Sequence, residues 1–234
     1  MPQLIGARCV PPHCRVCPGP HAGVVEAVPV DHPPVNRAAV STRLGAGAVP
    51  VDTVAAMPEL IAPTARLHTA WLEAHAEWGP GVHEDGFGLL PSDEVDAPAD
   101  FAAWVATLTD ALDQANPVAT SQVRCTYRWI VEGNRVLGGI ALRHEGNDAV
   151  RWAGHIGYGI RPSARRRGLA TWALGRILDQ ARVLGMDRVL IVCEADNVAS
   201  AKTTERLGGL LADVRDTEDG AARRYWIELS GPST

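Results

Sequence analysis

Residues 155–171 read HIGYGIRPSARRRGLAT, and this stretch carries the most informative pattern of the sequence. Residues 154–161 predict a β-strand, and residues 169–184 predict a helix that ends at Gly185. Between them, four arginines fall within seven positions, 161–167. We call residues 161–168 the arginine loop. Its four positive charges raise the question of what this loop binds.

The arginine loop joins the end of a strand to the start of a helix. Free backbone N–H groups and the helix dipole make such N-termini good phosphate sites. Gly168 and Ala170 keep this turn narrow, and Thr171 adds a hydroxyl. The spacing Arg-x-x-Gly-x-Ala is neither the nucleotide P-loop nor the Gly-x-Gly-x-x-Gly of dinucleotide folds. On the loop alone, a solvated basic turn is an equal alternative to a phosphate site.

Composition narrows the choice of ligand. The 234 residues are 46% hydrophobic and 21% charged, with a formal net charge of −5. An acidic total argues against general nucleic-acid binding, which usually needs a basic face. The sequence contains no run of about 18 apolar residues, so it predicts no membrane span. No secretory signal is recognisable. Five cysteines, an odd number, favour reduced thiols and a cytoplasmic location.

The first 56 residues differ from the rest. They hold nine of the 17 prolines and no Phe, Tyr or Trp, so we expect a largely disordered extension. The ordered pattern begins at Met57, and one hypothesis is that the true start is Met57 or Val51 and that the upstream residues are a mistranslated leader. Cys9, Cys14, Cys17 and His21 have a spacing that suits zinc, but chance cysteines in unstructured sequence are the favoured interpretation, and no metal is expected.

The rest of the chain predicts alternating helices and strands. Helices are expected at 65–78, 101–115 with Asp100 as cap, 169–184 and 197–207; strands are expected at 123–131, 135–142, 154–161, 189–193, 210–214 and 223–229. Residues 132–134 read as a hairpin turn, and residues 79–99 as a long acidic loop. The fold class is α+β, of the three-layer sandwich type: a mixed, mostly antiparallel central sheet flanked by helices, with one helical crossover from 154–161 to 189–193.

In this context the chain resembles the Gcn5-related N-acetyltransferase superfamily over about residues 57–229. GYGIRPSARRRGLAT is similar to the family's acetyl-CoA-binding strand and loop, with Arg165 opening its Gln/Arg-x-x-Gly-x-Gly/Ala motif. CEADNVASAKTTERLGG, residues 193–209, is similar to its second signature. PELIAPT, LRH and HIGYGIRPS together resemble a bacterial subgroup of predicted acetyltransferases. The resemblance implies the acyl-CoA N-acyltransferase fold over residues 57–234.

The resemblance also implies a cofactor site. The backbone of Gly159 and Ile160 would pair with the pantetheine arm, and the Ile160 N–H would serve catalysis by stabilising an oxyanion. Asn197 and Lys202 would meet the cofactor from the next helix. The pyrophosphate would lie on the loop residues Arg165, Arg166, Arg167, Gly168, Leu169, Ala170 and Thr171.

Direct attack on the thioester needs a neutral amine. An amine of pKa about 10.4 is only about 0.04% neutral at pH 7, so a base must take its proton. His155 and Glu194 are the first choices for this base; His144, Glu145 and Asp196 are further candidates. The family's tyrosine that protonates the leaving thiolate is replaced by Thr204. Water or Ser200 would then supply the proton.

The sequence thus predicts an N-acetyltransferase that moves an acetyl group from acetyl-CoA to a primary amine. The alternative is a non-catalytic module of the same fold that binds or senses acyl-CoA; nucleic-acid binding ranks last. The acceptor, a small molecule or a protein amine, is not identified, although the acidic loop 79–99 favours a cationic one. We expect no nucleic-acid or membrane partner, and a homodimer is an option.

Overall fold

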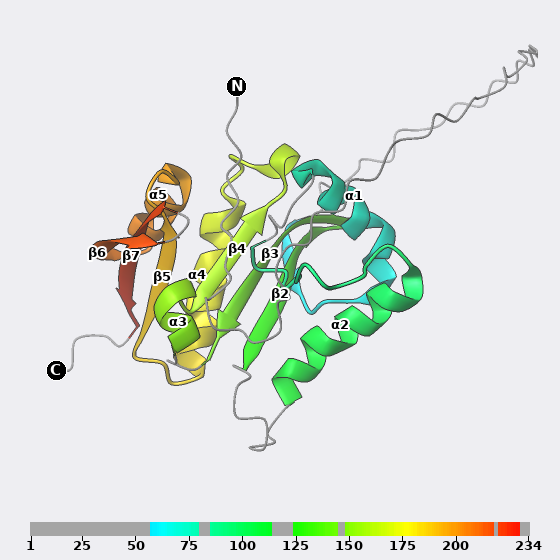
Figure 1. The fold of residues 1–234 in the computed structure, drawn as a ribbon, viewed down its shortest axis with the longest axis horizontal. Helices are drawn as coiled ribbons and strands as arrows, with labels where there is room; N and C mark the ends of the chain where they lie inside the picture. The colour runs from blue at the N-terminus through cyan, green and yellow to red at the C-terminus, as the bar shows by residue number, and fades with distance from the viewer. Residues whose placement is uncertain (1–56, 80–84, 114–123, 145–147, 218–219, 230–234) are drawn as a thin grey trace, which may run out of the picture. The chain divides into compact units, whose positions relative to one another are not determined.

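A computed structural model describes residues 57–79, 85–113, 124–144, 148–217 and 220–229 (Figure 1). The predicted extension 1–56, with its cysteine and histidine pattern, lies outside these ranges, so the expectations about it stay predictions. Every described residue belongs to one compact unit of the chain.

The first sheet has four antiparallel strands in the order β1-β2-β3-β4. Their bounds are Glu59–Ile61, Cys125–Glu132, Arg135–Arg143 and Ile156–Ile160. The predicted hairpin is present, and Gly133 in its turn has a φ of 62°, a left-handed conformation that favours glycine. β1 was not predicted as a strand, because three residues are too short to show a period.

Two helices cover one face of this sheet (Figure 1). A 3₁₀ turn, Ala65–Leu67, leads into α1, His68–Trp78, and α2 spans Pro98–Asp113. Because α2 begins at Pro98, Asp100 lies in its first turn and does not cap it as predicted. The core beneath them is aromatic and includes Trp71, Trp78, Phe87, Phe101, Trp104 and Trp129.

The other face carries α4, Leu169–Val183, with bounds close to the predicted ones. Its buried residues recur at helical spacing and include Leu174, Ile177 and Leu178. They pack against apolar side chains of both sheets, such as Ile140 and Ile191. This packing fixes the N-terminus of α4 beside the end of β4.

The second sheet has the order β5-β7-β6, again antiparallel. β5 is Arg188–Glu194, β6 is Leu210–Thr217 and β7 is Gly220–Glu228; α5, Val198–Arg206, lies between β5 and β6 in the chain. The structure adds a short helix, α3, Asp148–Ala153. It was not predicted, because six residues are too few to show a helical period.

The two sheets meet at the start of β4. The N–H of His155 donates to the carbonyl of Leu190 at 2.7 Å, and Gly154 forms an isolated bridge with Ile191. Within the described ranges, no ladder joins β4 to β5 beyond that point. The predicted α+β class and the helical crossover are therefore confirmed, and β4 and β5 part toward their ends.

Candidate functional site

A cleft of about 500 Å³ opens where β4 and β5 part. This volume lies in the usual range for small-molecule sites, about 300–1,000 Å³. The walls come from β4, the arginine loop, the first turn of α4, the end of β5 and α5. They include Tyr158, Ile160, Arg165, Gly168, Thr171, Cys193, Asn197, Ser200 and Lys202, with Trp78 and Asp85 from the opposite layer.

The backbone of β4 offers hydrogen-bonding groups to this cleft. His155 accepts a bond from β3 at 2.8 Å, and Arg161 donates one to β3 at 2.9 Å. In an antiparallel ladder, bonded residues alternate with residues whose backbone groups point away. The alternation therefore directs the backbone groups of Tyr158 and Ile160 toward β5 and those of Gly159 toward β3. Ile160 thus offers its backbone to the cleft as expected, whereas Gly159, which was expected to do the same, uses its backbone within the sheet.

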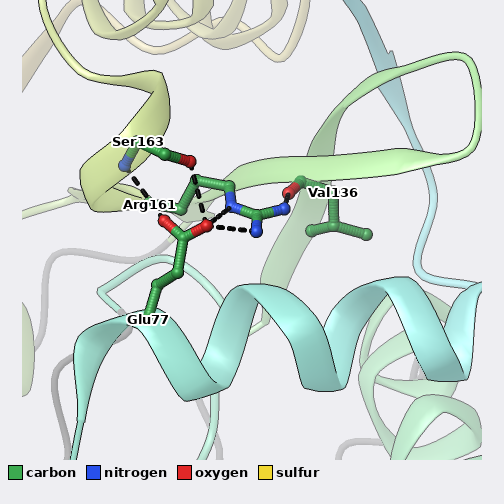
Figure 2. Close-up of polar contacts among 4 residues, drawn as sticks. All are labelled: Glu77, Val136, Arg161 and Ser163. Carbon is green, nitrogen blue, oxygen red and sulfur yellow. Dashed lines mark hydrogen bonds and ion pairs between the residues drawn. The ribbon is translucent and has the colours of Figure 1, made fainter.

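The start of the arginine loop is tied to α1 (Figure 2). Arg161 is buried, binds the carboxylate of Glu77 through Nε and Nη2, and donates from Nη1 to the carbonyl of Val136 at 3.0 Å. The same carboxylate accepts from the backbone N–H of Ser163 at 3.0 Å and from its hydroxyl at 2.9 Å. These bonds, led by Arg161, lower the pKa of Glu77 to about 2. Glu77 was not predicted from the sequence, because one acidic residue in a helix carries no pattern.

The end of the loop is shaped by two left-handed residues. Arg166 has a φ of 64° and Gly168, the N-cap of α4, a φ of 78°. No side chain caps α4, so its first N–H groups stay available to an anion. The Nε of Arg165 donates to the carbonyl of Ile160 at 2.9 Å, which holds this side chain against β4.

The structure brings together all but one of the residues predicted to bind the cofactor. The cleft is lined by Gly159, Ile160, Arg165, Arg166, Gly168, Leu169, Ala170, Thr171, Asn197 and Lys202. Arg167 is the exception, since its guanidinium forms an ion pair with Glu132. Asn197 also caps α5, as predicted, by accepting from the N–H of Ser200 at 3.0 Å.

Tyr158, which was not predicted as a site residue, reaches from β4 to α5 at the cleft. The hydroxyl of Tyr158 on β4 lies 2.9 Å from the Oγ of Ser200 on α5. Burial raises the pKa of Tyr158. Thr204, which resembles the family's tyrosine position, is fully buried, and its hydroxyl has no hydrogen-bond partner among the described residues. Only the fold brings these three hydroxyls to one place.

Asp85 is an acidic residue that lines the same cleft. Burial raises its pKa to about 7; the nearby charge of Glu194 adds to this, and Arg143 opposes it. Gly86 holds the segment against the sheet, because a Cβ at Gly86 would lie 2.5 Å from the carbonyl oxygen of Gly139. The carboxyl group of Asp85 can therefore gain or lose a proton near neutral pH.

The predicted bases are placed differently. Glu194, at the end of β5, acts on the titration of Asp85 but is not among the residues that line the cleft. His155 lines a different cavity, and its Nδ1 accepts from the N–H of Leu190 at 2.8 Å. Burial, together with the charge of Arg143, lowers the pKa of His155 to about 4. Glu145 lies outside the described residues.

The described residues hold neither a membrane-spanning helix nor a cluster of metal ligands. None of the helices there is both long and apolar enough to cross a membrane. No three His, Cys, Asp or Glu side chains in that part of the chain gather as metal ligands would.

Solved structures with the same fold have low sequence identity to this chain. yncA from Salmonella typhimurium, whose structure holds acetyl-CoA as cofactor, has 16% identity and a TM-score of 0.51 over 76% of this chain and 96% of its own. The microcin C7 self-immunity acetyltransferase MccE, in complex with acetyl-CoA and AMP, has 15% identity and a TM-score of 0.54, over 73% of this chain and 92% of its own. The ribosomal-protein-S5-alanine acetyltransferase from Vibrio fischeri has 12% identity and a TM-score of 0.56, over 76% of this chain and 94% of its own.

No curated protein matches the chain. The model of the acetyltransferase (GNAT) domain family matches residues 92–209, just over half of the sequence. The chain therefore belongs to the GNAT acetyltransferase family, as the arginine loop and the second signature predicted.

Proposed function

We propose that the chain transfers an acetyl group from acetyl-CoA to a primary amine by direct attack. The observation that carries this proposal is the cleft itself, which joins an uncapped helix N-terminus, an arginine loop and a free strand edge. An elongated thioester with a pyrophosphate needs these three features in this order.

The residues present fit acetyl-CoA. The first N–H groups of α4, with Arg165 and Arg166, would hold the pyrophosphate. The free edge of β4 would bind the amide groups of the pantetheine arm as a neighbouring strand would. The outward N–H of Ile160 would stabilise the oxyanion that forms when the amine attacks the thioester.

Asp85 is the group that we propose takes the proton from the amine. It lines the cleft, and its pKa of about 7 suits a base at neutral pH. His155, the first choice from the sequence, lines the other cavity, and its proton affinity is low. Glu194 then acts through Asp85, since its negative charge helps to hold the pKa of Asp85 high.

Tyr158 is the group that we propose returns a proton to the departing thiolate. Its phenol lines the cleft and is held by the hydroxyl of Ser200 at 2.9 Å. The proton would pass from Tyr158 to the sulfur and be replaced through Ser200 or solvent. A tyrosine on β4 would thus take the role lost at Thr204.

Calorimetric titration of acetyl-CoA into the full chain tests the donor half of the proposal. Gly168→Glu would place a carboxylate at the phosphate end of the cleft, and we expect it to weaken binding by at least about tenfold, an effect of about 1.4 kcal/mol. Gly185→Glu is the matched control, because Gly185 lies at the other end of α4, has a φ of 75°, and would meet nothing within 4 Å. Equal affinity in both variants would overturn the placement.

Release of CoA thiol in the presence of a panel of primary amines tests the second half. Turnover with any amine separates an enzyme from the alternative, an acyl-CoA-binding module without catalysis. Tight binding of acetyl-CoA without turnover of di- and polyamines, amino acids or peptide N-termini would favour that alternative. The panel includes cationic amines because Asp85 and Glu194 make this region acidic.

A further inference from the structure

A second cavity, of about 400 Å³, lies apart from the cleft. It is lined by Val150, Arg151, His155, Arg188, Leu190, Arg215, Arg224 and Trp226. Neighbouring residues separate the two spaces: His155 and Leu190 line this cavity, whereas Ile156 and Ile191 line the cleft. On β5, Val189 and Ile191 are buried against α4, so Arg188 and Leu190 point to the opposite side of that strand, and the cavity lies on the side of β5 away from α4. We call it the arginine cavity.

Four arginines line the arginine cavity, each from a different element. Arg151 comes from α3, Arg188 from β5, Arg215 from β6 and Arg224 from β7. None of the described residues that line the cavity is Asp or Glu. Like charges that share one space repel each other, so such a lining favours a bound anion.

Two of these arginines form ion pairs with the same carboxylate. Asp213 on β6 binds the Nη1 of Arg224 at 3.1 Å and the Nε of Arg215 at 3.2 Å. Its single charge orients both guanidinium groups but neutralises at most one. The Nε of Arg224 is buried and has no hydrogen-bond partner among the described residues. The pair of arginines thus retains positive charge after its contact with Asp213.

The remaining wall supplies a ring and one more donor. The guanidinium of Arg188 lies over the Trp226 ring, 4.3 Å from its centroid, which holds both side chains in place. Since the Nδ1 of His155 accepts a bond from the backbone, the neutral ring carries its proton on Nε2 and donates from there. The neighbouring charges of Arg143 and Arg188 help to lower the pKa of His155, in agreement with a positive field.

We propose that the arginine cavity is a second binding site, which takes a phosphate dianion, either free or as the monoester of a small molecule with a flat ring. Guanidinium groups match phosphate oxygens in geometry and charge. Trp226, which the guanidinium of Arg188 covers on one side, gives the site an aromatic wall. This site does not depend on acetyl-CoA, because none of its lining residues also lines the cleft.

Spectra of the ¹⁵N-labelled full chain test the proposal through the indole N–H of Trp226, which Trp226→Phe assigns. Inorganic phosphate and phenyl phosphate are titrated separately at constant ionic strength, with chloride as the reference anion. We expect this signal to shift and saturate with either phosphate, but not with chloride. Tighter binding of phenyl phosphate identifies the monoester as the ligand, and equal or weaker binding identifies free phosphate.

A double variant, Arg188→Gln with Arg215→Gln, is expected to weaken this binding at least tenfold. Both side chains are exposed, and the same spectrum reports that the variant is folded. Arg176→Gln on α4 is the control, because Arg176 is exposed and lines neither space. A Trp226 signal that does not saturate, or that saturates equally in the double variant, overturns the proposal.

Discussion

Glu77 and Arg161 lie 84 residues apart in the chain, and the ion pair between them joins α1 to the first residue of the arginine loop. The side chain of Arg161 is 7% exposed and that of Glu77 is 28% exposed. A cation that is this buried needs its partner, because the remaining charge would otherwise be left in a poorly solvated place. The shape of the candidate phosphate site therefore depends on a helix from the opposite layer of the fold.

Glu77→Gln is expected to destabilise the protein by about 2–3 kcal/mol at pH 7, since it removes the charge that Arg161 needs. The pKa of Glu77 is depressed from 4.5 to about 2 in the folded state. This contribution is therefore complete above about pH 5 and is lost as the pH falls toward 2. Chemical unfolding at a series of pH values measures it.

Glu73→Gln is the matched control for this prediction, because Glu73 is an exposed residue of the same helix. We expect it to change stability by less than about 0.5 kcal/mol. The assignment fails if Glu77→Gln loses stability in the same way as wild type when the pH is lowered from 5 to 3.

Gly86→Ala is expected to destabilise the protein by about 3 kcal/mol, which exceeds the usual cost of a left-handed alanine. Gly86 has a φ of 83°, and its Cβ would lie 2.5 Å from a backbone oxygen of Gly139. Gly79→Ala is matched to it, because Gly79 has a φ of 81° and its Cβ would meet nothing within 4 Å. The difference in unfolding free energy between the two variants isolates the clash, and equal losses would mean that the contact with Gly139 is absent.

Much of the frame of the site could be predicted from the sequence. The strand, the arginine loop and the helix at 154–184 are adjacent in the chain, so local periods and glycines describe them well. The hairpin of β2 and β3 is local for the same reason. β1 and α3 escaped prediction because three and six residues give no readable period.

The chemistry of the cleft was harder to predict, because it depends on which face a side chain takes. His155 and Ile156 are neighbours, yet one lines the arginine cavity and the other the cleft. A shift of one residue along a strand exchanges the two faces. Asp85 and Tyr158 lie far apart in the sequence and gain their roles only from the packing of an irregular segment and a helix against the sheet.

Tyr158→Phe is expected to lower kcat by about 10- to 100-fold and to leave the affinity for acetyl-CoA unchanged. The substitution removes only the hydroxyl that Ser200 holds at 2.9 Å, so the packing of the ring persists. Steady-state kinetics with the amine found in the panel, and calorimetry for acetyl-CoA, separate the two effects. An unchanged kcat with a weaker Kd would make Tyr158 a binding residue and not a proton donor.

Asp85→Asn is expected to lower kcat/KM by about 10²- to 10⁴-fold, the usual share of a general base. In the wild type, Asp85 accepts a proton only when ionised, so kcat/KM is expected to rise with pH through about 7. The asparagine cannot titrate, and this limb of the profile is expected to disappear. Asp96→Asn is the control, because Asp96 is exposed in the same connection between α1 and α2.

The same variant gives a readout that needs no substrate. The pKa of Asp85 is raised from 3.8 to about 7 in the folded state, so the folded protein holds a proton that the unfolded chain has lost. Its ionisation therefore opposes folding, and stability falls as the pH rises from about 4 to 7. Asp85→Asn removes this cost and is expected to raise the free energy of unfolding at pH 8, with little change at pH 4. A variant that is less stable than wild type at pH 8 would show that the Asp85 carboxylate is stabilised by its surroundings, and a proton acceptor with a pKa of about 7 would then have to be sought elsewhere in the cleft.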